Sequence, residues 1–183
     1  MEYLDICDEN GMPTGAVTAR STAHRDGILH RTAHLWVVRE ISGKYQVLMQ
    51  KRSMEKESFP GLYDTSSAGH IPAGDEPLSS ALRELSEELG IEAAPEQLNY
   101  AGSFRIEYEK VFHGKPFHDN EAVWVYVYRE PVDISRLHLQ ESEVESVRWF
   151  DLEEVWNETR TSRERFCAPS QGLEVLRKYL GII

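Results

Sequence analysis

Hydrophobic and polar positions alternate along much of the chain, and the pattern predicts a sheet of short strands. The β-branched and aromatic runs that have strand length are residues 32–39, 45–51, 63–67, 100–109, 121–128 and 146–150. Near the start, residues 3–7 and 15–20 flank a turn at 8–11 and predict a β-hairpin. We therefore expect strands along most of the chain, with helices restricted to the segments described next.

A helical period replaces the alternation in the segment 76–89. Its apolar stripe recurs at three- and four-residue spacing and consists of Leu78, Ala81, Leu82, Leu85 and Leu89. Asp151 is placed to cap a second helix that reaches about residue 158, and 172–180 predicts a terminal amphipathic helix. Strands in a mixed sheet with helices on both faces define an α/β sandwich. We therefore predict an α/β fold.

The face of the 76–89 helix opposite its apolar stripe is acidic. Glu84, Glu87 and Glu88 stand at i, i+3 and i+4, so their carboxylates lie within one turn. Carboxylates this close repel one another unless a cation neutralises them, and hard oxygen ligands suit Mg²⁺ or Mn²⁺. The alternative is a surface helix with a solvated acidic face, which is the usual fate of a charge run. The spacing favours a site for a divalent cation that binds substrate phosphates.

The segment 69–91 resembles the Nudix box, the signature of the Nudix hydrolases. The positions in register with that signature are Gly69, Arg83, Glu84, Leu85, Glu87, Glu88, Gly90 and Ile91. One position departs, because Asp75 stands where the family has glutamate, and it keeps the charge. The resemblance implies a Nudix-type α/β/α sandwich with a mixed β-sheet. As a single Nudix domain, residues 1–183 would comprise an N-terminal hairpin extension at 1–30, a Nudix core at 31–160 and a C-terminal helix at 161–183.

The same resemblance implies roles for the matching residues. Glu87 and Glu88 would ligate the metal, and Glu84 would serve as a ligand or as the general base. Arg83 would orient Glu84 through a charge-assisted hydrogen bond, and the Ala68 carbonyl is a candidate ligand. The implied activity is hydrolysis of a diphosphate bond in a nucleoside diphosphate-type or related organic diphosphate, with Mg²⁺ or Mn²⁺ as cofactor.

Residues from about 5 to 150 also resemble the type I isopentenyl diphosphate isomerases, which share the Nudix fold. The similar segments are 24–31, 50–52, 59–61, 69–70 and 119–121. In those isomerases, histidines and acids at corresponding places form a second metal site. Here the corresponding residues are His24, His30, His70, Asp119 and Glu121. Each histidine could instead be a hydrogen-bonded structural residue. Glu121 begins a predicted strand and is also a candidate catalytic base.

Isomerase chemistry needs a cysteine directly before the Gly-His pair, and this chain has Ala68 there. Neither Cys7 nor Cys167 can be aligned with that position. In the isomerase sequences the acidic residues at the core of the Nudix box are usually not all preserved, whereas this chain has all of them. The sequence therefore favours a hydrolase over an isomerase, and a non-catalytic module that binds a nucleotide or diphosphate is the third hypothesis.

Recognition of the substrate is harder to predict. Lys51 and Arg52 end a predicted strand, where they could bind a substrate phosphate or remain solvated charges. A loop at 110–120 and the acidic segment 141–145 are candidate walls of the pocket.

Bulk composition narrows the class of protein further. The 183 residues are 40% hydrophobic and 28% charged, which favours one globular domain. The net charge of −11 argues against direct binding of DNA or RNA. It also disfavours an anionic substrate unless a bound metal reverses the local potential. Two widely separated cysteines indicate a reducing, cytoplasmic environment. We expect no signal peptide and no membrane span, and a homodimer is possible because homodimers are common in the family.

Overall fold

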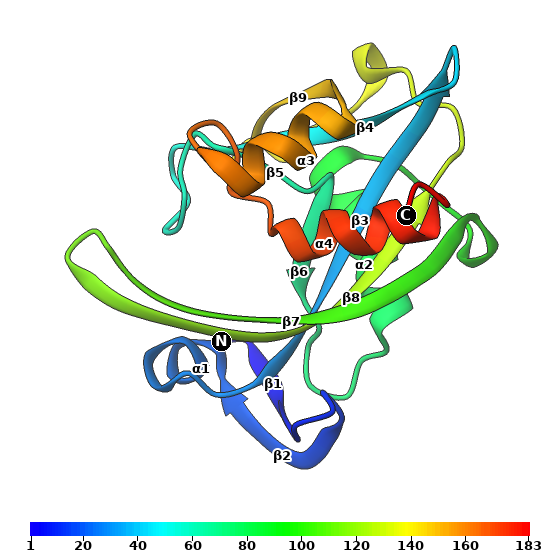
Figure 1. The fold of residues 1–183 in the computed structure, drawn as a ribbon. Coiled ribbons are helices and arrows are strands. Elements are labelled where there is room, and N and C mark those ends of the chain that lie inside the picture. The colour runs from blue at the N-terminus through cyan, green and yellow to red at the C-terminus, as the bar shows by residue number, and fades with distance from the viewer.

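The computed structural model describes all residues from Met1 to Ile183, which form a mixed sheet between two layers of helices (Figure 1). Its strands are β3 (His30–Ile41), β4 (Lys44–Arg52), β5 (Tyr63–Asp64), β6 (Ser67–His70), β7 (Leu98–Phe112), β8 (Lys115–Tyr128) and β9 (Val144–Asp151). The main path runs β5-β4-β3-β8-β7, with β6 also pairing β3 and β9 pairing β4. The β3–β8 pair is parallel and the others are antiparallel, so the sheet is mixed as predicted.

Helices cover both faces of this sheet. Helix α2 (Pro77–Leu89) packs on one face, while α3 (Leu152–Thr161) and α4 (Ser170–Tyr179) pack on the other. Alternate residues of β3 supply both cores, because successive side chains of a strand point to opposite faces. Leu35 packs in the core beneath α2, and Trp36 packs in the core beneath α3 and α4. The short 3-10 helices η1 (Pro95–Gln97) and η2 (Ile134–Arg136) lie in connections. The α/β sandwich predicted from the sequence is confirmed.

Helix α2 begins and ends almost where its sequence predicts. Pro77 occupies the first turn, where its missing N–H costs nothing. Gly90 ends the helix in the left-handed conformation, with φ of 68°, and its N–H bonds back to the last turn. Ala81, Leu85 and Leu89 of the predicted stripe are buried against the sheet. The helix is therefore held at a fixed rotation, which fixes the direction of its acidic residues.

The predicted strand at 63–67 is wrong, because the chain changes partner within it. β5 pairs with β4, and β6 then pairs with β3. The crossing lies where β3 and β4 diverge, and Ser66 bridges the fork there. Its hydroxyl accepts from the Val37 N–H and donates to the Leu48 carbonyl. This insertion carries the glycine turn of the Nudix-box segment to the edge of β3.

The segment predicted as a loop at 110–120 is instead the end of a long β-hairpin. β7 and β8 pair over their whole length and turn at His113 and Gly114, which both have positive φ. The hairpin curves well beyond the body of the domain (Figure 1). Next to the turn both polar and apolar residues are exposed, including Lys110, Val111, Lys115 and Pro116, so the sequence there lacks the apolar alternation that marks a half-buried strand.

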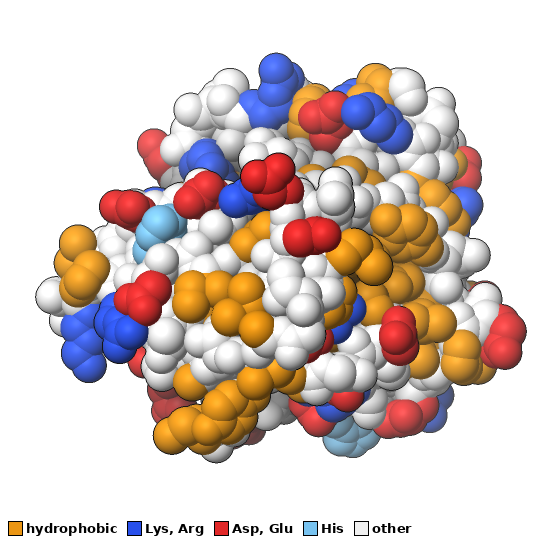
Figure 2. Space-filling view, turned by 90° about the horizontal axis from the view of Figure 1, so that it is seen from below, with side chains coloured by type: hydrophobic (Ala, Val, Ile, Leu, Met, Phe, Trp, Pro, Cys, Tyr) orange, Lys and Arg blue, Asp and Glu red, His pale blue; other side chains and the backbone are white.

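The N-terminal hairpin forms as predicted from β1 (Tyr3–Cys7) and β2 (Pro13–Ala19). It is followed by a helix that the sequence did not predict, α1 (Arg20–Asp26). Asp5 fastens the hairpin to the core through a buried ion pair with Arg31 at 2.8 Å. The view from below shows apolar side chains remaining on this part of the surface (Figure 2). None of the helices is long and apolar enough to cross a membrane.

Candidate active site

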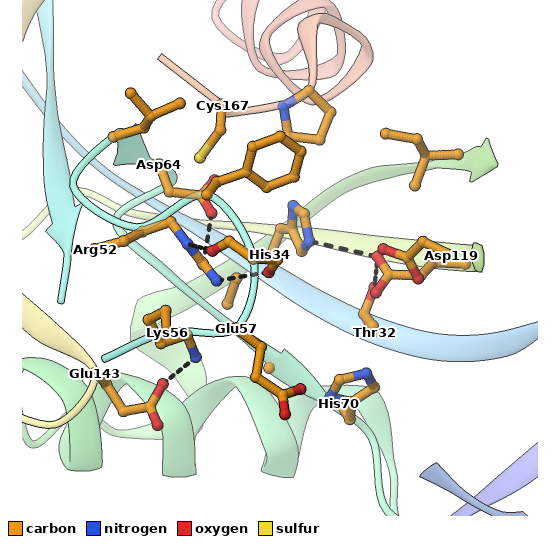
Figure 3. Close-up of a pocket in the computed structure, with 18 of the residues that line it drawn as sticks. Thr32, His34, Arg52, Lys56, Glu57, Asp64, His70, Asp119, Glu143 and Cys167 are labelled. Carbon is orange, nitrogen blue, oxygen red and sulfur yellow. Dashed lines mark hydrogen bonds and ion pairs between the residues drawn. The ribbon is translucent and has the colours of Figure 1, made fainter. Parts of the chain in front are cut away.

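One large, mainly polar cavity of about 1070 Å³ opens beside the glycine turn. Its walls include the acids of α2. Figure 3 shows the walls that are formed by Asp119 of β8 and by Lys56 and Glu57 in the loop that follows β4. The lining residues that matter most below are His34, Ala68, His70, Glu84, Glu88 and Glu121. The cavity therefore joins the Nudix-box segment to the residues predicted as a second metal site.

Two of the three α2 carboxylates, Glu84 and Glu88, are largely removed from solvent, which argues against a plain acidic surface. Glu88 is only 4% exposed and accepts hydrogen bonds from Gln50 Nε2 at 2.9 Å and from the Ala68 N–H at 3.2 Å. Burial, reinforced by the nearby Glu84 carboxylate, raises the pKa of Glu88 to about 8. Glu87 is half exposed, although it also lines the cavity. A cation between the buried acids would offset both causes of this shift.

Gly69 and Arg83 determine where Glu84 points. A Cβ atom at Gly69 would lie 2.2 Å from both Cδ and Oε1 of Glu84, so any other residue would displace that carboxylate. Arg83 contacts Glu84 Oε1 at 2.8 Å through Nη1, and its Nη2 donates to the His70 carbonyl at 3.3 Å. Burial raises the pKa of Glu84 as well. The arginine thus connects α2 to β6 and holds the carboxylate against the glycine turn.

The histidines and acids predicted as a second site converge from separate elements. Candidate ligand atoms of His24, His30, His70 and Glu121 all lie within 4.8 Å of one another. The Nε2 atoms of His24 and His70 are 3.2 Å apart. Asp119 Oδ1 lies 3.8 Å from His24 Nε2 and 4.0 Å from His30 Nε2. The structure therefore brings all of these residues together, including His24, which comes from the unpredicted helix α1.

Two buried atoms in this cluster lack a partner, which is the feature that best fits a bound cation. His30 Nδ1 donates to the Ile28 carbonyl at 2.8 Å, which leaves the lone pair on Nε2. That Nε2 and Asp119 Oδ1 are both buried without a hydrogen bond. Burial lowers the pKa of His24 to about 3 and that of His70 well below its usual value. Neutral imidazoles with carboxylates form a donor set suited to Mn²⁺ or another transition ion.

Strand register explains how the cluster assembles. β3 lies between β8 and β6, with His30 opposite Glu121 and Thr32 opposite His70. Thr32 Oγ1 donates to Glu121 Oε2 at 3.1 Å and so orients that carboxylate. Burial raises the pKa of Glu121 far above its usual value, with Asp119 as the next cause. The acids are therefore crowded together, and a cation would relieve their repulsion.

The predicted phosphate-binding residues differ in position. Arg52 lines the cavity, where its Nη1 contacts Asp64 Oδ2 at 3.0 Å and its Nε donates to the Ser58 carbonyl at 2.9 Å. Lys51 pairs with Glu145 at 2.7 Å and is not among the lining residues. Of the two, only Arg52 is placed to face a ligand in the cavity.

Sequence reasoning missed several residues of the site. Lys56 lines the cavity and pairs with Glu143, which lies in the acidic segment predicted as a wall. Gln50 is 3% exposed and its side chain donates a hydrogen bond to Glu88. The sequence feature that could have indicated this role is a polar residue at the end of an apolar run. His34 is also buried and lines the cavity, and only the strand register shows where it points.

The fold and the cavity define an α/β sandwich in which helix α2 presents acidic side chains to a glycine turn beside a mixed sheet. The chain belongs to the Nudix family, because the NUDIX domain model matches residues 29–168. Nudix hydrolase 3 of Arabidopsis thaliana is 39% identical over 158 residues, or 85% of this chain and 20% of that protein. An uncharacterized Nudix hydrolase of Clostridium acetobutylicum is 36% identical over 84% of this chain and 72% of its own length. This chain thus spans about a fifth of the length of the Arabidopsis relative.

The chain is also similar to an isomerase, as the sequence predicts, and to solved structures with the same fold. The isopentenyl-diphosphate Delta-isomerase of Shigella flexneri is 27% identical, covering 84% of this chain and 79% of that protein. A crystal structure from Deinococcus radiodurans superposes with a TM-score of 0.70 at 19% identity, over 96% of this chain and 98% of its own. A C. elegans Ap4A hydrolase complex has a TM-score of 0.56 at 23% identity, over 84% of this chain and 98% of its own. The two structures show the shared fold.

Proposed function

We propose that the chain is a hydrolase that cleaves a diphosphate bond in a nucleoside diphosphate-type or related organic diphosphate, with Mg²⁺ or Mn²⁺ as cofactor. The observation that carries the proposal is the buried carboxylate of Glu88 with the mostly buried Glu84 beside it, both lining a large polar cavity next to the Gly69 turn. Burying two carboxylates side by side is costly unless a cation accompanies them. Their position therefore supports a role in binding a metal.

The residues of the Nudix box would have separate roles in hydrolysis. Glu87, Glu88 and the Ala68 carbonyl would hold the cation, with Glu84 as a further ligand where it does not serve as the base, and the bound cation would offset the charge of the diphosphate. Glu84 is the candidate base, because Arg83 fixes its carboxylate at the cavity wall. It would take a proton from the water whose oxygen bonds to phosphorus. The bridging P–O bond then breaks, and its electron pair leaves with the departing phosphate.

The histidine cluster would hold a second cation in the same cavity. His24, His30, His70, Asp119 and Glu121 supply its donors, and the orphaned atoms of His30 and Asp119 support this assignment. Glu121 is an alternative base, because Thr32 already orients it. Arg52 would face a substrate phosphate across the cavity.

Isomerase activity is the competing proposal, and the histidine cluster with the 27% identical isomerase favours it. Against it, Ala68 places a methyl group where that chemistry requires a thiol. Cys167 does line the cavity, but burial raises the pKa of its thiol well above the usual value. A protonated thiol in that place is a poor substitute, so we favour hydrolysis.

The test is a metal-dependent turnover screen. The protein is incubated with Mg²⁺ or Mn²⁺ and nucleotide sugars, dinucleotides, nucleoside di- and triphosphates, coenzyme A and prenyl diphosphates, and products are read by mass. Glu88→Gln removes a proposed ligand with little change in volume, and Glu96→Gln makes the same change at an exposed site. We expect cleavage that EDTA and Glu88→Gln abolish and Glu96→Gln preserves. Isopentenyl diphosphate converted to dimethylallyl diphosphate without cleavage would instead establish the isomerase.

A further inference from the structure

His34 is a buried polar side chain that the roles above leave unused. It is 7% exposed, it lies on β3, and it lines the cavity. In Figure 3 its ring projects into the cavity between Arg52 and Asp119. Its Nε2 lies 4.0 Å from Glu121 Oε2, beyond hydrogen-bond distance. Its other nitrogen, Nδ1, is buried without any partner.

The strand register explains why this ring reaches the cavity. His34 is directly opposite Ala68 in the antiparallel pair of β3 and β6. Side chains of an opposed pair lie on the same face of a sheet, about 5 Å apart at Cβ. Ala68 has only a methyl group, so it leaves the space beside the imidazole open. Phe104 packs edge-on against the ring at 5.9 Å and limits its rotation.

The proton of this imidazole belongs on Nε2. An N–H group at the buried Nδ1 would have no acceptor, and such unpaired donors are rare in folded proteins. With the proton on Nε2, the donor points to the Glu121 side of the cavity. His34 is also absent from the group of ligand atoms that lie within 4.8 Å of one another. This placement distinguishes it from the histidines of the second metal site.

We propose that His34 is a substrate-contacting residue whose Nε2–H donates to a phosphoryl oxygen of the bound diphosphate, beside Glu121 and opposite Ala68. The inference rests on the proposed function, because it assumes that a diphosphate binds in this cavity. The substrate phosphates would then contact a hydrogen-bond donor on the sheet as well as the cations that the acids would hold. Donors fixed before the substrate arrives need no reorganisation as charge develops on the phosphoryl group.

Two substitutions separate the hydrogen bond from the packing of the ring. His34→Leu keeps an apolar body and removes the donor, whereas His34→Gln keeps an amide N–H near the position of Nε2. His113→Leu at the exposed hairpin tip is the matched control. Calorimetry measures binding of Mn²⁺ alone, and then of methylenediphosphonate, whose bridge cannot be hydrolysed, at saturating Mn²⁺. Turnover is followed with the compound that the screen finds best cleaved.

We expect His34→Leu to weaken the binding of methylenediphosphonate by about tenfold to a hundredfold, because a hydrogen bond to a charged group is lost. Mn²⁺ binding should be unchanged, kcat/KM should fall in parallel, and His34→Gln should recover most of both losses. Unchanged diphosphate binding in His34→Leu would refute the proposal. Loss of Mn²⁺ binding would refute it as well, by making His34 a metal ligand.

Two further outcomes are also decisive. If His34→Leu does not fold, His34→Gln is compared with His34→Asn, whose amide is too short to reach the Nε2 position. Weaker diphosphate binding in the asparagine variant supports the proposal, and equal binding overturns it. If the wild-type protein binds methylenediphosphonate through His34 but cleaves nothing in the screen, the proposed hydrolase function fails while this inference stands.

Discussion

Gly69→Ala is the sharpest test of the geometry of the box. The new Cβ would stand 2.2 Å from the Glu84 carboxyl group, whereas ordinary carbon contacts begin near 3.5 Å. Glu84 must therefore retreat by about 1 Å, which breaks its 2.8 Å contact with Arg83. A displacement of that size in a reacting group can cost about 10²-fold in rate. We expect a loss of this order in kcat, measured at saturating Mn²⁺.

The effect on folding should be much smaller than the effect on rate. Overpacking costs about 1–3 kcal/mol in a rigid core, and the lower end applies because the flexible end of Glu84 can swing into the cavity. For a chain of this length, about 1 kcal/mol lowers the Tm by roughly 2–4 °C.

The control is Gly43→Ala in the exposed turn between β3 and β4, where a Cβ would meet no atom within 4 Å although the left-handed backbone, with φ of 76°, still costs some stability. Its turnover should equal that of the wild type. Full turnover in Gly69→Ala, or an equal loss in both variants, would refute the reasoning.

Three other outcomes follow from the site. Because the pKa of Glu88 is raised from 4.5 to about 8, the metal-free folded protein retains a proton that the unfolded chain releases. The stability of the folded protein in EDTA should therefore fall as the pH rises from 4.5 to about 8. Thermal melts of Glu88→Gln should show a shallower fall over the same range. Gln50→Leu removes a donor to the Glu88 carboxylate, so Mn²⁺ titrations should show affinity weakened by about tenfold or more, and unchanged affinity would exclude a supporting role. His30→Gln should lower the Mn²⁺ bound per chain, measured by elemental analysis after gel filtration, and an unchanged ratio would contradict the second site.

The parts of the site that could be predicted from sequence are those whose determinants are local. Glu84 and Glu88 are one helical turn apart, so their shared direction follows from spacing alone. Pro77 and Gly90 mark the two ends of the helix for equally local reasons. The helix of the box and its acids therefore needed no knowledge of the sheet.

The missed parts depend on tertiary contacts. α1 has a single buried residue, Ala23, so no apolar stripe indicates a helix. Its end is held from elsewhere, since the Gly27 carbonyl accepts a hydrogen bond from the Asn120 side chain at 2.9 Å. The roles of Gln50 and His34 likewise depend on which residues of the neighbouring strands and helix they face. A pattern that repeats every two residues shows which face a side chain takes, but not its cross-strand neighbour.

Strand β3 is the physical link between the two sets of candidate ligands. One of its edges pairs with β6, which carries Ala68 and the Gly69 turn, and the other pairs with β8, which carries Glu121. A one-residue slip of either pair would turn His30 and His34 away from the cavity, because strand side chains alternate between faces. The Ser66 hydroxyl resists such a slip, since it bonds to both β3 and β4 at their fork. The acids of the box and the histidine cluster are therefore held in one register, and a diphosphate in the cavity would lie within reach of both.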